Sequence, residues 1–270
     1  YPSRTYAPSV RAMSGNGLFD ISGKVAIVTG GTRGIGYMIA RGFVEAGVRV
    51  YISSRKADDC AAVAAELSEI GQCIGIAADL QSDDESRRLA AEVAEREDAL
   101  HILVNNAGAT WGAPIDEFPG SAFDKVLTLN VKAPFVLTQA CLPMLRAAGT
   151  HDDPARVINI GSIDGIHVPM LETYSYSASK AGIHQLTRHL ARNLGRDHIT
   201  VNAIAPGPFE SKMMAATLRD FGDSIARSSV LNRIGRPDDM AGTAIFLSSR
   251  AGSYITGSTI AVDGGIATTK

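Results

Sequence analysis

KVAIVTGGTRGIG, residues 24–36, joins an apolar run to a cluster of glycines and then to a helix-like stretch. Gly30 suits a tight turn, while Gly34 and Gly36 would let the backbone approach a ligand and let the helix pack on a sheet. A helix that begins here would offer free N–H groups and the positive end of its dipole. The order of strand, glycine turn and helix therefore predicts a phosphate cradle, against the alternative of a plain glycine-rich turn. The residues expected to contact a bound phosphate group are Gly30, Thr32, Arg33, Gly34, Ile35 and Gly36.

The same alternation continues along the rest of the chain. Apolar, strand-like runs occupy residues 24–29, 48–53, 73–77, 101–105, 156–160, 199–204 and 258–263. Helix-like stretches occupy residues 35–46, 57–70, 83–97, 121–148, 177–195 and 237–249. Near-continuous apolar strands that alternate with helices are typical of a parallel sheet covered on both faces. We predict an α/β fold: one doubly wound Rossmann-type domain over residues 20–270, with about seven strands and helices on both faces.

Composition excludes several classes of protein. A formal net charge of −2 gives no electrostatic footprint for nucleic acid or an anionic membrane. No apolar run approaches the roughly 18 residues of a membrane span. Cys60, Cys73 and Cys141 are too few and too scattered for a disulfide framework or a zinc site, which favours a reducing, cytoplasmic location. His184 and His189 lie five residues apart and no H-E-x-x-H occurs, so no metal site is expected.

Two segments stand outside the regular pattern. Residues 1–19 are expected to be a disordered N-terminal extension, because YPSRTYAPSVRA at residues 1–12 has no acid and no apolar stretch of a signal peptide. A short transit peptide is the alternative. Residues 206–232 form a long connection after a predicted strand, and such connections are usually functional lids. We predict a substrate lid there, with a pair of ordinary surface helices as the alternative.

The end of the second predicted strand selects between two dinucleotides. A 2′-hydroxyl of NAD requires a carboxylate at this position, whereas a 2′-phosphate requires an arginine. The chain reads ISSRK at residues 52–56, with no acid, and Arg33 adds a second cation from the glycine turn. Ser54 and Arg55 are therefore expected to contact the phosphate of NADP(H). The alternative is that Arg55 and Lys56 only solvate the start of a helix.

YSYSASK, residues 174–180, carries a tyrosine and a lysine four residues apart. On a helix that spacing puts Tyr176 and Lys180 on one face, whereas Tyr174 lies about 240° away from the lysine. A free tyrosine has a pKa near 10. An ammonium at about 5 Å would favour the phenolate by roughly 3 kcal/mol and lower the pKa by about two pH units. Tyr176 is therefore the candidate acid–base group.

These features occur together with further short motifs in a fixed order. They are TGGTRGIG at 29–36, NNAG at 105–108, Asn130 within LTLNV, Ser162 within INIGS, Tyr176 and Lys180 as YxxxK, and PG at 206–207. Over nearly all of residues 20–266 the chain resembles the classical short-chain dehydrogenase/reductase family. The resemblance implies a hydride-transfer enzyme that uses NADP(H).

The family assigns a role to each of four side chains. Tyr176 would donate a proton to the substrate carbonyl oxygen, and Ser162 would hydrogen-bond and polarise that oxygen. Lys180 would bind the nicotinamide ribose and lower the pKa of the tyrosine. Asn130 would hold a water that links Lys180 to solvent.

The resemblance also implies further cofactor contacts. Asp79 and Leu80 would contact the adenine, and Phe209 would approach the nicotinamide amide. The remaining cofactor residues implied by the motifs are Asn106, Ala107, Gly108, Tyr176, Lys180, Pro206, Gly207 and Ser211. Two departures from the family pattern are mild: His101 replaces a frequent acid before ILVNNAG, and Ser211 replaces a frequent threonine.

Within the family, RIGRPDDMA and YITGSTIAVDGG resemble the 3-oxoacyl-[acyl-carrier-protein] reductases. GATWGAP, PARVINIGSIDGI and the paired tyrosines resemble the branch linked to rhamnolipid-type β-hydroxyacid formation. The implied substrate is a small or carrier-linked carbonyl compound, foremost a 3-oxoacyl thioester. The alternatives are an oxidoreductase of another ketone or alcohol, such as a sugar, polyol, steroid or quinone, and a non-catalytic NADP-binding regulator. The family also implies a homotetramer.

Overall fold

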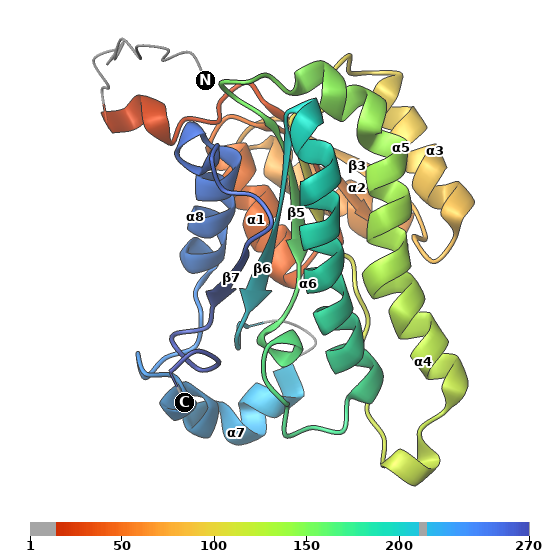
Figure 1. Ribbon diagram of the computed structural model, residues 1–270, viewed down its shortest axis with the longest axis vertical. Helices are drawn as coiled ribbons and strands as arrows, with labels where there is room; N and C mark the ends of the chain where they lie inside the picture. Colours follow the sequence, from red (N-terminus) through yellow and green to blue (C-terminus); the bar gives the residue numbers. More distant parts are fainter. Residues whose placement is uncertain (1–14, 211–214, 270) are drawn as a thin grey trace, which may run out of the picture.

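Parallel strands form the centre of the molecule. The structure is a computed structural model that describes residues 15–210 and 215–269. Its strands are β1 (Val25–Thr29), β2 (Arg49–Ser54), β3 (Cys73–Ala77), β4 (Ile102–Asn105), β5 (Ala155–Ile160), β6 (Ile199–Pro206) and β7 (Thr259–Val262). Within the described residues they make one seven-stranded sheet in the order β3-β2-β1-β4-β5-β6-β7, parallel throughout. The predicted Rossmann-type sheet is confirmed (Figure 1).

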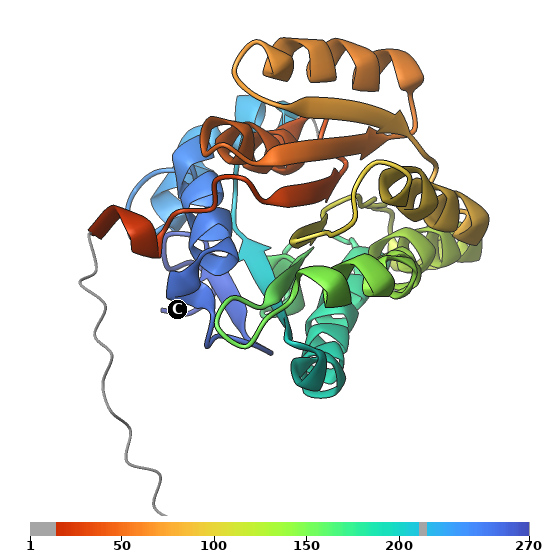
Figure 2. The ribbon, with the colours of Figure 1, turned by 90° about the horizontal axis from the view of Figure 1, so that it is seen from above.

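Helices cover both faces of the sheet (Figure 2). One face packs against α1 (Gly34–Glu45), α2 (Ala57–Ser68) and α8 (Pro237–Ser248). The other packs against α3 (Asp83–Ala94), α5 (Ala133–Ala148) and α6 (Tyr174–Leu194). No helix among the described residues is long and apolar enough to cross a membrane.

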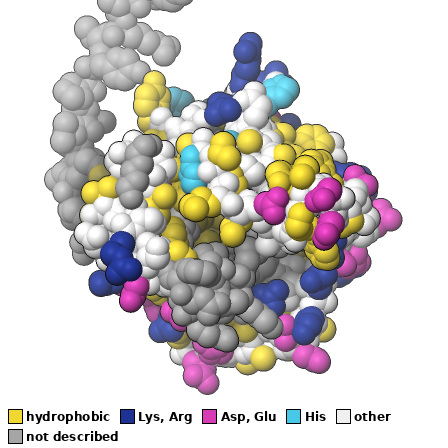
Figure 3. All heavy atoms as spheres, turned by 90° about the horizontal axis from the view of Figure 1, so that it is seen from below, with side chains coloured by type: hydrophobic (Ala, Val, Ile, Leu, Met, Phe, Trp, Pro, Cys, Tyr) yellow, Lys and Arg dark blue, Asp and Glu magenta, His cyan; other side chains and the backbone are white. Residues whose placement is uncertain are grey.

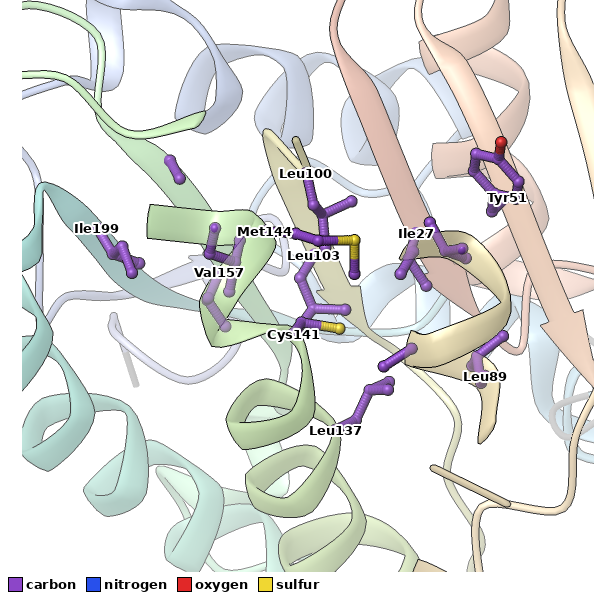
Figure 4. Close-up of a cluster of buried hydrophobic side chains, with 14 of the residues drawn as sticks. Ile27, Tyr51, Leu89, Leu100, Leu103, Leu137, Cys141, Met144, Val157 and Ile199 are labelled. Atoms are coloured by element: carbon purple, nitrogen blue, oxygen red, sulfur yellow. The ribbon is translucent and has the colours of Figure 1, made fainter. Parts of the chain in front are cut away.

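Alternation along each strand fills two separate cores. In β1, Val25 and Ile27 belong to the core beneath α3, α5 and α6, whereas Ala26 and Val28 belong to the core beneath α1, α2 and α8. Figure 4 shows the first of these cores, where Leu137 and Cys141 of α5 approach the sheet. Because successive side chains of a strand point to opposite faces, a strand buried on both sides must be apolar at every position. This requirement explains the near-continuous apolar runs in the sequence.

The long helix predicted over residues 121–148 is interrupted. The chain forms α4 (Gly120–Leu127), a π-helical turn (Thr128–Lys132) and then α5. Pro134 follows the turn and has no N–H to donate to the carbonyl of Asn130 four residues earlier, so the regular α-helical ladder is broken at that point. The interruption therefore coincides with a residue that the sequence assigns to the site.

The irregular segments are only partly described. The predicted extension 1–19 falls mostly outside the described residues, although Gly15–Leu18 form a short 3-10 helix. In the predicted lid, residues 211–214 lie outside the described part, and Ala215–Ser228 form the single helix α7 rather than a pair.

The order of the strands determines where a ligand binds. After β3 the chain crosses from one edge of the sheet to the other side of β1, where β4 pairs with β1. At such a switch point the connections leave in opposite directions, and a crevice opens at the carboxyl ends of the strands. These ends point toward α7 in Figure 1, so the loops after β1, β4, β5 and β6 meet on that side.

A buried cluster of charged side chains lies at the amino ends of the strands, opposite the carboxyl ends described above. Asp153 accepts hydrogen bonds from Lys24 at 2.8 Å and from Arg156 at 2.9 Å. Arg156 is almost fully buried and also donates to the carbonyls of Leu247 and Ser249 at the end of α8. Burial lowers the pKa of both Lys24 and Arg156, and Asp153 opposes that effect. The cluster joins β1, β5 and α8.

Replacing Asp153 by alanine is expected to lower the free energy of unfolding by about 1–3 kcal/mol. Removal of one partner leaves buried cations uncompensated, but Asp153 is itself partly exposed, so the loss falls below the 3–5 kcal/mol of a fully buried pair. Urea denaturation measures the change. Asp152→Ala is the matched control, since Asp152 is 93% exposed and its carboxylate pairs with the exposed His151 instead of the buried cations. Equal stabilities of the two variants would contradict the role given to the cluster.

Candidate active site

The glycine turn after β1 is shaped by close backbone contacts. Gly30 and Gly34 have φ of 64° and 55°, which side chains rarely adopt. A Cβ on Gly36 would overlap the carbonyl oxygen of Gly30 and the side-chain amide of Asn106. Helix α1 begins at Gly34, so its first N–H groups face the turn. The predicted phosphate cradle has the required backbone shape.

Thr29 joins this turn to the loop that follows β4. Its hydroxyl accepts the N–H groups of Asn106 at 2.9 Å and Ala107 at 3.0 Å. In return, the Asn106 amide donates to the carbonyl of Thr29 at 2.8 Å. The NAG motif is therefore held against the glycine turn from both sides, and Gly108 follows at the surface. The sequence reasoning missed Thr29, although a threonine ending a buried strand beside a glycine turn was a usable signal.

Cations gather where a 2′-phosphate would lie. Arg33 and Arg55 are exposed, and neither forms an ion pair with a carboxylate within the described residues. Ser53 and Ser54 occupy the end of β2, where an NAD enzyme would place an acid. Thr32 and Ile35 flank Arg33 in the glycine turn and are partly exposed. The absence of a competing carboxylate leaves both guanidinium groups available for a phosphate dianion.

Ser162, Tyr176 and Lys180 come together between β5 and α6. Ser162 directly follows the sheet and accepts the N–H of Asp164 at 3.1 Å. The hydroxyl of Ser162 lies near the phenol of Tyr176 and favours its ionised form. The ammonium of Lys180 lies 5.4 Å from the centre of the Tyr176 ring and donates to the carbonyl of Ile160 at 2.7 Å. The predicted helix face is confirmed, since α6 begins at Tyr174 and carries both residues.

The direction expected for the pKa of Tyr176 is wrong for this chain. Burial raises the pKa of Tyr176 to about 12, and the nearby Ser162 hydroxyl only partly opposes the rise. Burial also lowers the pKa of Lys180 to about 8, against the attraction of Asp164. Both changes have one cause: a site shielded from water disfavours the charged form of either group. The phenol is therefore a neutral proton donor at physiological pH.

Asn130 uses its whole side chain to hold neighbouring segments. Its carbonyl oxygen accepts the N–H of Ala109 at 2.8 Å, and its amide donates to the carbonyl of Ala109 and to the hydroxyl of Ser179, both at 2.9 Å. Ser179 donates to the carbonyl of Tyr176 at 2.7 Å. The side chain is thus committed to positioning these segments. The sequence reasoning missed Ser179.

A second buried polar network supports the site from below. Asn105 donates to Asn159 at 2.9 Å and to Thr138 at 3.2 Å, and Asn159 donates to Thr187 at 2.9 Å. These side chains come from β4, β5, α5 and α6, which are the elements that carry the candidate residues. A satisfied network of this kind fixes the relative positions of its elements. One asparagine near the end of each of two otherwise apolar strands, Asn105 in β4 and Asn159 in β5, was the signal for it.

Of four other residues predicted to contact the cofactor, the three that the structure describes differ in their exposure to solvent. Asp79 is exposed at the end of β3, whereas Leu80 is buried in a hydrophobic core. Phe209 is 2% exposed and its ring packs on Gly235. The ring is therefore buried, and it is not free to approach a nicotinamide as predicted. Ser211 lies outside the described residues.

The PG motif ends β6. Pro206 pairs with Val262 of β7, and a Cβ on Gly207 would approach Asp263 to 2.7 Å. Within the described residues, no group of three or more His, Cys, Asp or Glu side chains is placed to hold a metal ion.

The buried ammonium of Lys180 predicts a pH-dependent stability. Its pKa of about 8 in the folded chain lies below the 10.5 of a free lysine, so between these values the unfolded chain binds more protons. The stability of the wild type should therefore rise with pH in that window, relative to Lys180→Met, which cannot titrate there. The free-energy difference between the two proteins is expected to change by about 2–3 kcal/mol in favour of the wild type from pH 7 to pH 10.

Urea denaturation of both proteins at several pH values measures the difference. Lys132→Met, at an exposed lysine paired with Asp83, is the control and should show no comparable trend. A difference between wild type and Lys180→Met that stays constant with pH would contradict a buried, depressed lysine.

The chain is similar to known proteins over most of its length. Residues 30–267 match the family described as "Enoyl-(Acyl carrier protein) reductase". The chain is 47% identical to the "Rhamnolipids biosynthesis 3-oxoacyl-[acyl-carrier-protein] reductase" of Pseudomonas aeruginosa, over 92% of this chain and 97% of that protein.

Solved structures agree with this match. The "Pseudomonas aeruginosa RhlG/NADP active-site complex" superposes with a TM-score of 0.90 at 47% identity, over 93% of this chain and 99% of the other. A gluconate 5-dehydrogenase from Burkholderia cenocepacia, in complex with NADP and tartrate, superposes with a TM-score of 0.87 at 30% identity, over 94% and 99%. The fold, the ordered motifs and these matches together show that the chain belongs to the short-chain dehydrogenase/reductase family.

Proposed function

We propose that this protein is an NADPH-dependent carbonyl reductase that converts 3-oxoacyl thioesters to 3-hydroxyacyl thioesters. The observation that carries the proposal is the placement of Ser162 and a buried Lys180 beside the phenol of Tyr176. A relative that is 47% identical over nearly its full length bears the name of a 3-oxoacyl reductase. All four side chains of the family's catalytic set are present, which argues against a non-catalytic regulator.

The residues present fit a bound NADP(H). The turn leaves no room for a side chain at Gly30 or Gly36, and Gly34 has a positive φ, as a backbone cradle for a pyrophosphate requires. Arg33 and Arg55 stand free of carboxylates in the described part of the chain, as a 2′-phosphate requires. Bound NADPH would supply the hydride for the reduction.

The chain's own side chains manage the proton and the developing charge. Tyr176 has its proton at physiological pH and donates it to the carbonyl oxygen as that oxygen gains negative charge. Ser162 accepts the N–H of Asp164, which leaves the hydroxyl proton free to point at the same oxygen. Lys180, with a pKa of about 8, is a proton source beside the phenol. Asn130 would hold the water that returns the proton.

A reductase of another small ketone is the second candidate. Relatives named as sugar-acid dehydrogenases, among them gluconate 5-dehydrogenase of Gluconobacter oxydans at 31% identity, share this framework. The difference between the candidates lies in the loops 110–120, 163–173 and 206–232.

The proposal extends to the surroundings of the enzyme. We infer a homotetramer in the cytoplasm that takes its substrate from a carrier or as a free thioester. Phe135 is exposed on α5, as expected of a helix that packs on another subunit, and the free Cys60, Cys73 and Cys141 suit a reducing compartment.

Tyr176→Phe is expected to lower kcat with acetoacetyl thioester and NADPH by about 100-fold to 10,000-fold, the range for loss of a positioned acid. The phenol alone supplies the proton, so the affinity for NADPH should change less than about twofold. Loss of NADPH absorbance measures turnover, and fluorescence titration measures binding. Tyr174→Phe is the matched control, because Tyr174 contacts Glu172 and Phe118 instead of the site. Retained turnover in Tyr176→Phe would contradict the acid role.

Arg33→Ala and Arg55→Ala should each raise the KM for NADPH by roughly 10-fold to 100-fold and leave that for NADH nearly unchanged. Each substitution removes a charge-assisted hydrogen bond to the 2′-phosphate, and NADH has no such group. Steady-state kinetics with both cofactors test the expectation. Arg41→Ala serves as the control, since Arg41 on α1 is paired with Glu45. Equal losses with NADPH and NADH would contradict the phosphate contact.

A further inference from the structure

Large apolar side chains are exposed on the segment between Ser162 and Tyr176. Ile166, Val168, Met170 and Leu171 all lie open to solvent, and Val168 and Met170 are 90% and 101% exposed. Single exposed apolar side chains are ordinary on a protein surface. Four within six residues mark a ligand or partner surface.

This segment is fixed at both ends by the catalytic residues. At its start, Ser162 accepts the N–H of Asp164, and Ser177 donates to the carbonyl of Asp164 at 2.8 Å. A Cβ on Gly165 would come within 2.5 Å of the backbone of Lys180, so the turn lies directly on α6. At its end the chain enters α6 two residues before Tyr176. The apolar side chains therefore lie on the segment that connects the two residues whose hydroxyls would bind the reacting carbonyl.

A second loop lies beside the first. Ala113 donates its N–H to the carbonyl of Glu172 at 3.2 Å, and the ring of Phe118 meets Tyr174 edge-on at 5.6 Å between centroids. The second loop adds two more exposed apolar side chains, Trp111 and Ile115. We call the six side chains together the apolar lip: Trp111, Ile115, Ile166, Val168, Met170 and Leu171. Because the two loops are bonded to each other, the lip cannot turn inward without breaking these contacts.

We propose that the apolar lip binds the hydrocarbon tail of the substrate, so that the enzyme selects 3-oxoacyl thioesters with long tails. This inference rests on the proposed function. In such a substrate the reacting carbon carries an apolar tail on one side and the thioester on the other. With that carbon between Ser162 and Tyr176, the tail can follow the segment that joins them and cover side chains that otherwise face water.

Charge at the lip argues for an uncharged occupant. Asp116, Glu117 and Glu172 are exposed beside the apolar side chains, and Figure 3 shows hydrophobic and acidic side chains as neighbours on this side of the molecule. Carboxylates disfavour an anionic membrane surface or a free fatty-acid head group. A sugar acid would gain nothing from six apolar side chains, whereas an acyl tail is neutral and apolar.

The test is a chain-length series of 3-oxoacyl-CoA substrates with four, six, eight and ten carbons, at saturating NADPH and below the concentration of micelle formation. Wild-type kcat/KM is expected to rise about twofold to fourfold for each added methylene, the upper value corresponding to full burial of a CH₂ group. The triple variant Val168→Thr, Met170→Gln, Leu171→Asn keeps side-chain shape and adds polarity. It should flatten the series while its value with the four-carbon substrate stays within about twofold of wild type.

Ile70→Thr, which makes the same kind of change at an exposed position in the turn before β3, is the control and should keep the wild-type slope. A flat wild-type series with good turnover of the four-carbon substrate would overturn the inference and leave the proposed function standing. Absence of turnover at every length would instead remove the proposed function. A triple variant that keeps the slope, but changes sedimentation or binding to neutral vesicles, would assign the lip to a second copy or a lipid surface and overturn the inference.

Discussion

The approach of helix α1 to the turn after β1 is the contact on which the site depends. Gly36 lies so close to the carbonyl of Gly30 and the amide of Asn106 that only a hydrogen atom fits on its Cα. That closeness brings the first N–H groups of α1 to the switch point of the sheet, and Thr29 holds the loop after β4 in the same place. A side chain at Gly36 would push α1 away from the loop after β1 and from the loop after β4. The cradle and the start of the NAG loop are therefore one structure.

Exclusion of water has opposite consequences for the two ionisable groups of the site. It keeps the phenol of Tyr176 protonated and brings the pKa of Lys180 down to about 8, within reach of physiological pH. The cost of burying the phenolate exceeds any attraction to the ammonium, and so the direction of the shift is opposite to the expected one. The lysine is held by the carbonyl of Ile160, which keeps it beside the phenol whether or not it is charged. The framework thus favours proton donation, the direction that a carbonyl reduction requires.

The stabilising ion cluster lies at the amino ends of the strands, and the candidate site lies at their carboxyl ends. The ion cluster of Lys24, Asp153 and Arg156 binds β1, β5 and α8 together far from the cleft. The loops on the cleft side, in contrast, expose apolar side chains between acids. Such a division lets substrate-facing loops differ between relatives while the parallel sheet stays the same. It is consistent with TM-scores of 0.90 and 0.87 for relatives with different names.

Local pattern was sufficient for the sheet, the glycine turn and the pairing of Tyr176 with Lys180. Each of these rests on a period or spacing along one short segment: apolar strands buried on both sides, φ values open to glycine, and four residues along a helix. The pattern did not reveal the π-helical turn at Asn130, the link through Ser179 or the burial of the Phe209 ring, because each depends on a partner distant in the chain. The pKa of Tyr176 and the exposure of the apolar lip also depend on partners distant in the chain, so the pattern did not reveal them either. The sequence by itself determined which residues are candidates for the chemistry, and only the tertiary structure decided how deeply they are buried, since burial is a property of packed neighbours and not of spacing.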